Sequence, residues 1–219
     1  MKYALLSLPR ECDQVSAYTR SFSAVFQHPF YGWLGLRPAL AQHTAAEHRA
    51  LQRWAAGRMS IVELGVAEGV SALAMREVMG QNACLYLVDP FHLSRIPVLN
   101  FVKRVAHKAV GSCRRGKVFW IPKFSHEALS GWDTPIDLLF IDGDHAESAV
   151  ERDWNDWSPF VRASGIAIFH DARMFQGGWV RPDYGPLRVV DRFFRNTDAP
   201  GWQIADEVDS LVVVERLRE

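Results

Sequence analysis

The stretch Asp137–Asp144, DLLFIDGD, with His145 directly after it, is an apolar strand that ends in two acids and an imidazole. A second run, Ile166–Asp171 or IAIFHD, follows the same plan and ends in His170 and Asp171. Continuous apolar runs are typical of parallel strands that are buried on both faces. Residues that follow such strands face the ligand crevice of an open α/β sheet. The sequence therefore predicts a reaction centre at one sheet edge, although each acid alone would also suit a helix cap.

From residue 41 onward, the sequence alternates between helical and strand patterns. Strands are predicted at residues 59–64, 84–88, 117–121, 136–141 and 165–169, and helices at 41–56, 70–79, 98–110, 125–129, 146–158 and 188–195. Thr44 and Glu47 have the spacing of a capping box at the first of these helices. Two last strands, 202–207 and 210–215, are joined by a turn too short for a parallel crossover. We expect an α/β fold with a seven-stranded, mostly parallel sheet, a C-terminal antiparallel hairpin and helices on both faces.

Residues 1–40 form an aromatic-rich extension in front of the domain at 41–219. A short helix is predicted at 13–26, and His28-Pro29 should break it because a residue before proline avoids the helical region. Such an extension suits a lid over the active site or a contact in a homodimer. Simple packing against the domain explains it equally well.

Composition and charge exclude several classes of protein. The 219 residues include 25 basic and 25 acidic side chains, so the formal net charge is zero and no nucleic-acid partner is expected. Three dispersed cysteines suit a reducing compartment rather than a disulfide framework or a zinc site. The first residues have too short an apolar run for a signal peptide, and no run is long enough to span a membrane. We therefore expect a cytoplasmic protein.

A glycine loop follows the first predicted strand. In VELGVAEGVS, Glu63, Gly65 and Gly69 have the spacing E-x-G-x-x-x-G, and Ser71 opens the next helix. This is not the G-x-G-x-x-G pattern that binds a pyrophosphate, and an acid here would repel phosphate but suit a cation. Asp89 ends the second strand, where an acid can bind both hydroxyls of a ribose. The combination predicts a nucleoside ligand with a charged amino-acid arm.

These segments together resemble the class I S-adenosylmethionine-dependent methyltransferases. The resemblance rests on IVELGVAEGVSALAM, LYLVDP, DLLFIDGDHAESAVERDWNDW and GIAIFHDAR, and it extends over about residues 51–217. It implies a Rossmann-like sheet that ends in the antiparallel hairpin. FIDGDH and FHD are similar to a branch of small-molecule O-methyltransferases that act on sugars of metabolites and polysaccharides. A narrower likeness is to actinobacterial enzymes that methylate polymethylated mannosides.

The resemblance also implies roles for individual residues toward S-adenosylmethionine. Glu63, Gly65 and Gly69 would line the methionine arm, with Ser71 near its carboxylate, and Asp89 would bind the ribose. Phe91, Ser125 and His126 are the implied contacts with the adenine, and Asp142 and Asp144 are further implied contacts with the cofactor.

In metal-dependent members of this branch, acids at the ends of the fourth and fifth strands hold magnesium. The matching positions are Asp142, His170 and Asp171. His170 departs from the usual carboxylate, and magnesium prefers oxygen ligands, so an imidazole here favours manganese or another softer ion. The resemblance therefore implies a divalent metal whose identity stays open.

Methyl transfer to a hydroxyl requires removal of its proton as well as alignment with the donor methyl. His145 is the first candidate for the base, because it follows Asp142 and Asp144 on the same strand-end loop. His170 is the alternative base if no metal binds, and Asp142 would anchor either the metal or the acceptor. Arg173, Trp179 and other side chains of nearby loops are expected at the same rim; these others are His92, Arg181 and Tyr184.

The predicted function is thus metal-assisted O-methylation of a saccharide or glycosylated small molecule. The alternatives are a phenol or catechol O-methyltransferase, an N-methyltransferase that needs no metal, and a cofactor-binding domain without catalysis. Acids and histidines at both strand ends argue against the last of these, and the glycine spacing argues against a dehydrogenase.

Overall fold

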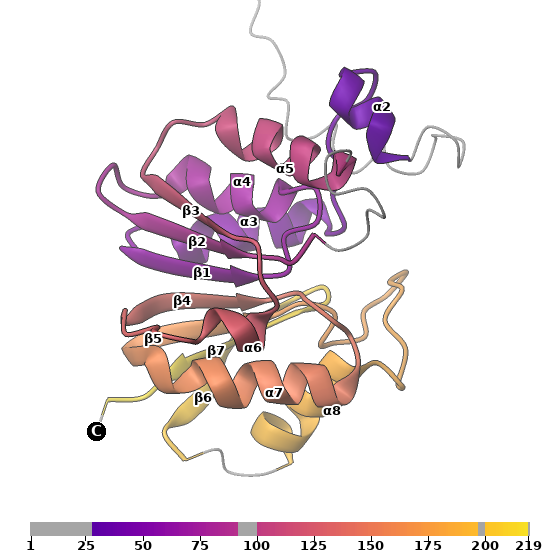
Figure 1. Cartoon of the computed structure of the whole chain (residues 1–219). Coiled ribbons are helices and arrows are strands. Elements are labelled where there is room, and N and C mark those ends of the chain that lie inside the picture. The colour runs from indigo at the N-terminus through magenta and orange to yellow at the C-terminus, as the bar shows by residue number, and fades with distance from the viewer. Residues whose placement is uncertain (1–27, 92–99, 197–199, 219) are drawn as a thin grey trace, which may run out of the picture.

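A computed structural model describes residues 28–91, 100–196 and 200–218. Its centre is a seven-stranded sheet in the order β3-β2-β1-β4-β5-β7-β6, in which β7 alone is antiparallel to both of its neighbours (Figure 1). The strands are β1 (Ser60–Leu64), β2 (Cys84–Val88), β3 (Lys117–Ile121), β4 (Ile136–Ile141), β5 (Val161–Phe169), β6 (Trp202–Val208) and β7 (Leu211–Arg216). The predicted Rossmann-like sheet with its C-terminal antiparallel hairpin is confirmed.

Helices cover both faces of the sheet, as predicted (Figure 1). One face carries α3 (Ala45–Ala55), α4 (Val70–Val78) and α5 (Phe101–Gly111); the other carries α6 (Ser125–Ala128), α7 (Glu147–Trp157) and α8 (Gly185–Val190). Alternate residues of each central strand point to opposite cores: Leu138 and Phe140 pack with α3 to α5, whereas Leu139 and Ile141 pack with α7 and α8. All six residues of β4 are buried, which explains its continuous apolar run.

Several predicted boundaries differ from the structure, for example the start of α3 at Ala45 rather than at residue 41, and two of them involve glycine. β5 begins at Val161 rather than at Gly165, which instead lies at an irregularity where the register with β4 shifts. A Cβ on Gly165 would lie 2.7 Å from the carbonyl oxygen of Arg162, so glycine marks a tight point inside the strand. α8 begins at Gly185, three residues before the predicted start, because Pro186 suits the first turn of a helix. A π-helical turn, η4 (Asp191–Arg195), continues it.

The described part of the N-terminal extension packs on the domain. Pro29 opens a helix, α2 (Pro29–Leu34), with His28 as its N-cap, so the predicted break is also a helix start. Arg37 forms a bidentate ion pair with Glu68 of the glycine loop, with N–O distances of 2.7 and 2.6 Å. The predicted helix at 13–26 lies outside the described residues, and the roles of lid and dimer contact stay predictions.

The ends of the parallel strands are tied together at one edge of the sheet. The amide of Asp142 donates to Leu64 O at 2.8 Å, and the amide of His170 donates to Ile141 O at 3.1 Å. The amide of Gly65 donates to Val88 O at 2.9 Å. The segments after β1, β2, β4 and β5 therefore meet at this edge. Within the described ranges, no helix is both long and apolar enough to cross a bilayer.

Candidate active site

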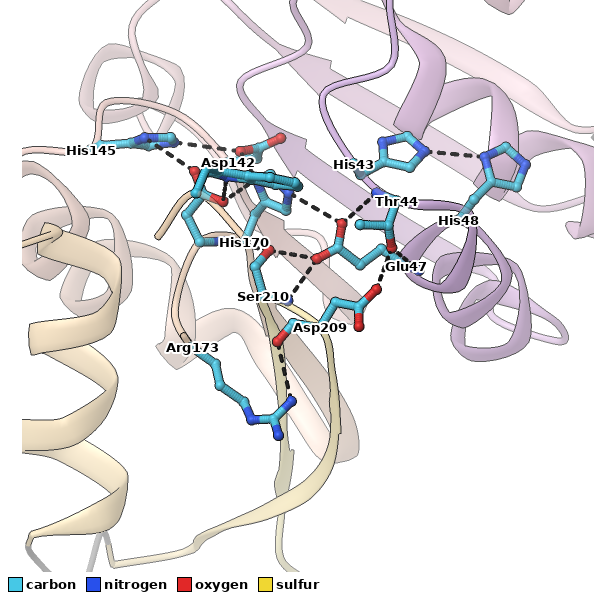
Figure 2. Close-up of polar contacts among 12 residues, drawn as sticks. His43, Thr44, Glu47, His48, Asp142, His145, His170, Arg173, Asp209 and Ser210 are labelled. Carbon is cyan, nitrogen blue, oxygen red and sulfur yellow. Dashed lines mark hydrogen bonds and ion pairs between the residues drawn. The ribbon is translucent and has the colours of Figure 1, made fainter. Parts of the chain in front are cut away.

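His170 lies at the centre of the polar cluster at this edge, and its side chain is 3% exposed (Figure 2). Its Nδ1 is 2.9 Å from Oδ1 of Asp142 and 3.5 Å from Oδ1 of Asp171. Its Nε2 faces Oε2 of Glu47 at 3.8 Å, a distance of ion pairing rather than hydrogen bonding. His170 is thus surrounded by three carboxylates.

These neighbours change the pKa values of the pair. Burial by itself lowers the pKa of His170, but the charge of Asp142, the hydrogen bond with it and the nearby carboxylates of Glu47 and Asp171 raise it well above its usual value. Burial likewise raises the pKa of Asp142, yet the charge of His170, the hydrogen bond with it and the nearby ring of His145 lower it to about 2. The two shifts favour the protonated form of His170 and the ionised form of Asp142.

His145 lies beside this pair and is the accessible member of the site, with 43% of its side chain exposed. Its Nε2 is 3.7 Å from Asp142 Oδ1, and its Nδ1 is 3.5 Å from Asp171 Oδ2. The nearby carboxylate of Asp142 raises the pKa of His145, burial opposes this, and the charge of Asp171 adds to the increase. Trp179 donates to Asp171 Oδ1 at 2.7 Å and holds that carboxylate toward His145.

The start of α8 packs against the segment that carries His145. A Cβ on Gly185 would lie 2.3 Å from the carbonyl oxygen of His145 and 2.4 Å from the amide of Glu147. The ring of Tyr184 is 6.2 Å from the ring of His145. Only glycine permits this approach, and the close contact fixes the loop after β4 against α8.

Glu47 is the member of the cluster that the sequence did not assign to the site. It is fully buried and projects from α3 toward the turn between β6 and β7 (Figure 2). Its Oε1 accepts from the amide and hydroxyl of Ser210, at 2.7 and 2.6 Å, and its Oε2 accepts from the amide of Thr44 at 2.6 Å. The capping-box spacing explained Glu47 locally, so the sequence held no further signal of a contact with His170.

The glycine loop touches the loop after β4. Gly65 has φ +88°, and a Cβ on it would lie 2.1 Å from the carbonyl oxygen of Asp142. Glu63 is fully buried and accepts from the hydroxyl of Ser71, while its Oε2 has no hydrogen-bond partner among the described residues. Burial raises the pKa of Glu63 well above its usual value, with the charges of Asp142 and Asp89 adding to the effect. An orphaned buried carboxylate oxygen is a site for a cationic donor.

Asp89 organises the other side of the glycine loop. Its Oδ2 accepts from the amides of Val66 and Ala67 at 2.8 and 3.1 Å, and its Oδ1 accepts from the amide of Phe91 at 2.7 Å. The two amides engage both lone pairs of Oδ2, whereas Oδ1 can accept a further hydrogen bond from a hydroxyl. Phe91 is buried against Trp120, with ring centroids 6.1 Å apart.

Three other predicted cofactor residues have contacts within the protein. Ser125 donates to Asp153 Oδ1 of α7 at 2.5 Å, and the exposed His126 stacks on Phe124. Asp144 is exposed and accepts from the amide of Ala146 at 2.9 Å, which is the local capping role. Their contacts with a cofactor stay predictions.

Some of the loop residues expected at the rim lie at the site and others do not. Trp179 donates to Asp171, and the ring of Tyr184 lies near that of His145. Arg181 lies over the ring of Tyr184, 5.3 Å from its centroid. Arg173 instead turns away and donates to Asp209 O of the hairpin at 3.2 Å (Figure 2). His92 lies outside the described residues.

The strand-end residues can hold the implied divalent metal, whose presence stays a prediction. Ligand atoms of Asp142, His145 and His170 lie within 4.8 Å of one another, which is close enough for a shared ion. A metal-binding imidazole must be neutral and direct a lone pair at the ion. Nε2 of His170 is buried without a hydrogen-bond partner among the described residues, and only Oδ1 of Asp171 accepts from Trp179. Magnesium, which prefers oxygen ligands, is the least suited ion.

Fold and site define a Rossmann-like methyltransferase architecture. Solved structures have the same fold. The O-methyltransferase from Bacillus cereus, in complex with SAH, is similar with a TM-score of 0.59 and 13% identity, and the match covers 93% of this chain and 96% of that chain. TomG from Streptomyces achromogenes, an O-methyltransferase of tomaymycin synthesis in complex with SAM, has the same TM-score and identity, with 95% of it and 94% of this chain covered. Cofactor-bound Rv0187 from MTB has a TM-score of 0.62 at 15% identity, over all of its length and 97% of this chain.

The sequence itself matches a family described as a methyltransferase domain over residues 62–172, just over half of the chain. The protein belongs to this methyltransferase domain family. The match begins in β1 and ends just after Asp171, so it includes the glycine loop and both strand-end clusters but leaves out α3 with Glu47.

Proposed function

We propose that the protein is an S-adenosylmethionine-dependent O-methyltransferase that acts on a hydroxyl of a saccharide or glycosylated small molecule. One observation carries the proposal: the glycine loop, at Gly65, directly touches the loop that carries Asp142 and His145. A donor bound on the glycine loop would therefore lie beside an accessible histidine held by two carboxylates. This is the arrangement that methyl transfer to a hydroxyl requires.

The residues around the glycine loop fit S-adenosylmethionine. Glu63 would face the ammonium group of the methionine arm, with Gly65, Gly69 and Ser71 shaping the loop around it. Asp89 would bind the ribose hydroxyls, with Phe91 beside it. The complexes of the Bacillus cereus enzyme with SAH and of TomG with SAM support this choice of cofactor. The cofactor would supply the electrophilic methyl group.

His145 is the proposed base. Its ring is partly exposed, so an acceptor hydroxyl can reach it, and Asp142 and Asp171 hold its orientation and stabilise its protonated form. His170 is less suited, because it is buried between Asp142 and Glu47, away from an acceptor. No step of this proposal passes through a divalent metal.

A saccharide acceptor is supported by the side chains next to His145. Trp179 is 40% exposed. Arg181 and Tyr184, which follow it closely in the sequence, form a cation–π pair. Aromatic faces suit the apolar face of a sugar ring, and guanidinium groups suit its hydroxyls. A phenol is the second candidate acceptor for the same surface.

The test is an acceptor screen with purified protein and S-adenosylmethionine, read as release of S-adenosylhomocysteine and as methylated product by mass spectrometry. Hydroxylated sugars and glycosides are expected to be methylated at oxygen. Turnover of amines alone would contradict the proposal. Loss of activity with EDTA and its recovery with manganese would show that the strand-end residues hold a divalent metal.

The rate should depend on pH through His145. The base must be neutral to accept a proton. The pKa of His145 lies above the usual 6.5 because of the nearby carboxylates of Asp142 and Asp171, whereas the charge of His170 lowers it. The ring of Tyr184 also faces His145. We expect kcat/KM to fall as pH decreases, with a midpoint above 6.5.

The matched variant for this pH profile is Asp171→Asn. Asparagine keeps an acceptor for Trp179 but removes one negative charge from the neighbourhood of His145. The midpoint of kcat/KM should therefore shift to lower pH. A midpoint that does not move would show that another group controls the rate.

A further inference from the structure

We propose that Arg37 is a positioning residue for the cofactor: through Glu68 it holds the glycine loop in the shape that presents Asp89 to a ribose. Arg37 lies outside the residues that match the methyltransferase domain family. The segment before α3 therefore supplies a part of the cofactor site that the matched region lacks. This inference rests on the proposed function, because it takes S-adenosylmethionine as the ligand of the glycine loop.

The contact between Arg37 and Glu68 is a buried ion pair, with side chains that are 0% and 9% exposed. Both terminal nitrogens of the guanidinium donate to the carboxylate, at 2.7 and 2.6 Å. The amide of Leu40 adds a third hydrogen bond, at 2.8 Å to Oε2. A bidentate pair of arginine and carboxylate fixes direction as well as distance. Residues 37–40 therefore hold the carboxylate of Glu68 in one place.

The guanidinium of Arg37 is itself held by the packing of α2 on α5. A Cβ on Gly32 of α2 would lie 3.0 Å from Nη1 of Arg37 and 3.1 Å from the side chain of Val105 in α5. The rings of Phe30 and Phe101 meet edge to face between the same two helices, with centroids 5.2 Å apart. The ion pair thus joins the glycine loop to this helix pair.

Glu68 lies at the most constrained point of the glycine loop. Ala67 before it has φ +46° and Gly69 after it has φ +80°, a left-handed region that is costly for alanine. The amide of Ala67 donates to Oδ2 of Asp89 at 3.1 Å. Without its arginine, the buried charge of Glu68 would have to turn toward water, because an unpaired buried carboxylate is costly. Such a movement would displace Ala67 and release Asp89.

The ion pair also gives different roles to the two buried acids of this region. Glu68 receives its three hydrogen bonds from residues 37–40. Oε2 of Glu63, in contrast, has no hydrogen-bond partner among the described residues. Glu63 is thus the acid that faces the ammonium group of the cofactor, whereas Glu68 fixes the backbone beside Asp89.

The test is calorimetric binding of S-adenosylhomocysteine to the full-length protein and to Arg37→Met, which keeps an unbranched apolar chain but removes the guanidinium. The affinity should fall by roughly 10- to 100-fold, as for other residues that orient a binding group. The KM for S-adenosylmethionine should rise by a similar factor, whereas kcat at saturation should stay within a few-fold of the wild type. Unchanged affinity in the variant would overturn this inference.

An analogue of S-adenosylhomocysteine that lacks both ribose hydroxyls separates positioning of Asp89 from general damage. The wild type should bind the analogue more weakly than S-adenosylhomocysteine, because Asp89 loses its partner. In Arg37→Met the two ligands should bind with similar affinity, because Asp89 is no longer held toward the ribose. An equal loss for both ligands would show that Arg37 does not act on Asp89, and would overturn the proposal.

Two further variants test the route through Glu68. Arg37→Lys keeps the charge but not the planar fork, so it should restore part of the affinity, and it provides the comparison with the wild type if Arg37→Met does not fold. The double variant Arg37→Met/Glu68→Gln should lose no more affinity than Arg37→Met alone, because the two residues act together. Additive losses would show that Arg37 does not act through Glu68.

Arg162→Met is the matched control. It also removes the arginine partner of a buried acid, Asp137, at an N–O distance of 2.6 Å, but it does so at the opposite edge of the sheet, where β4 and β5 begin. It should lower the free energy of unfolding and leave the affinity for S-adenosylhomocysteine unchanged. A loss of affinity equal to that of Arg37→Met would mean that stability alone is responsible. Failure of the wild type to bind this ligand would instead overturn the proposed function, and this inference with it.

Discussion

His145→Ala is expected to lower kcat by roughly 10²- to 10⁴-fold, the usual contribution of a positioned general base. The affinity for S-adenosylhomocysteine should change little, because the predicted cofactor contacts of the glycine loop and Asp89 do not involve the imidazole. Alanine removes the only side chain of the cluster that is both accessible and held by two carboxylates among the described residues. Single-turnover methyl transfer and calorimetric binding of S-adenosylhomocysteine measure the two quantities separately.

His126→Ala is the control for this variant. His126 is also an exposed histidine near the carboxyl ends of the strands, but it stacks on Phe124 and has no carboxylate partner among the described residues. Its loss should leave kcat within a few-fold of the wild type, and its implied contact with the adenine would be measured as a change in the KM for S-adenosylmethionine. If His145→Ala retained full kcat, the base would have to be another group and the proposed mechanism would fail.

Gly65→Ala is expected to destabilise the protein by roughly 4 kcal/mol and to abolish cofactor binding. The backbone of Gly65 has φ +88°, and the added Cβ would lie 2.1 Å from the carbonyl oxygen of Asp142 and 2.7 Å from Cα of Gly143. Neither backbone atom can move without shifting the loop after β4. The change in free energy of unfolding, from urea titration, and the affinity for S-adenosylhomocysteine measure the effect.

Gly57→Ala separates backbone strain from close contact. Gly57 has φ +78°, but no atom lies within 4 Å of the position that a Cβ would take. Its replacement should cost only about 1 kcal/mol, the strain of a left-handed conformation. Equal costs at both positions would show that contact between the glycine loop and Asp142 does not matter for stability.

The local patterns predicted most of the fold. Apolar runs, turn residues and the short final connection were sufficient for the sheet and its hairpin, because a strand buried on both faces has a composition that surface strands lack. The boundary errors included the starts of β5 and of α8. At both places glycine serves tight packing against another segment, at Gly165 and Gly185, and single-residue patterns do not reveal such contacts.

The site was predicted in part for the same reason. Asp142, His145, His170 and Asp171 follow two buried strands, so a parallel sheet must bring them together, and the structure does so. Their relative charges were not predictable. The structure places His170 between Asp142, which follows β4, and Glu47 of α3.

The sequence by itself determined the class of fold, the edge at which chemistry occurs and the glycine loop beside it, because each of these follows from the order of neighbouring residues. Only the tertiary structure decided which groups share a proton or a charge. Glu47 reaches His170 across 123 positions of sequence, and Arg37 reaches Glu68 across 31. Such contacts depend on how helices dock on the sheet, and the pKa values of buried groups depend in turn on these contacts.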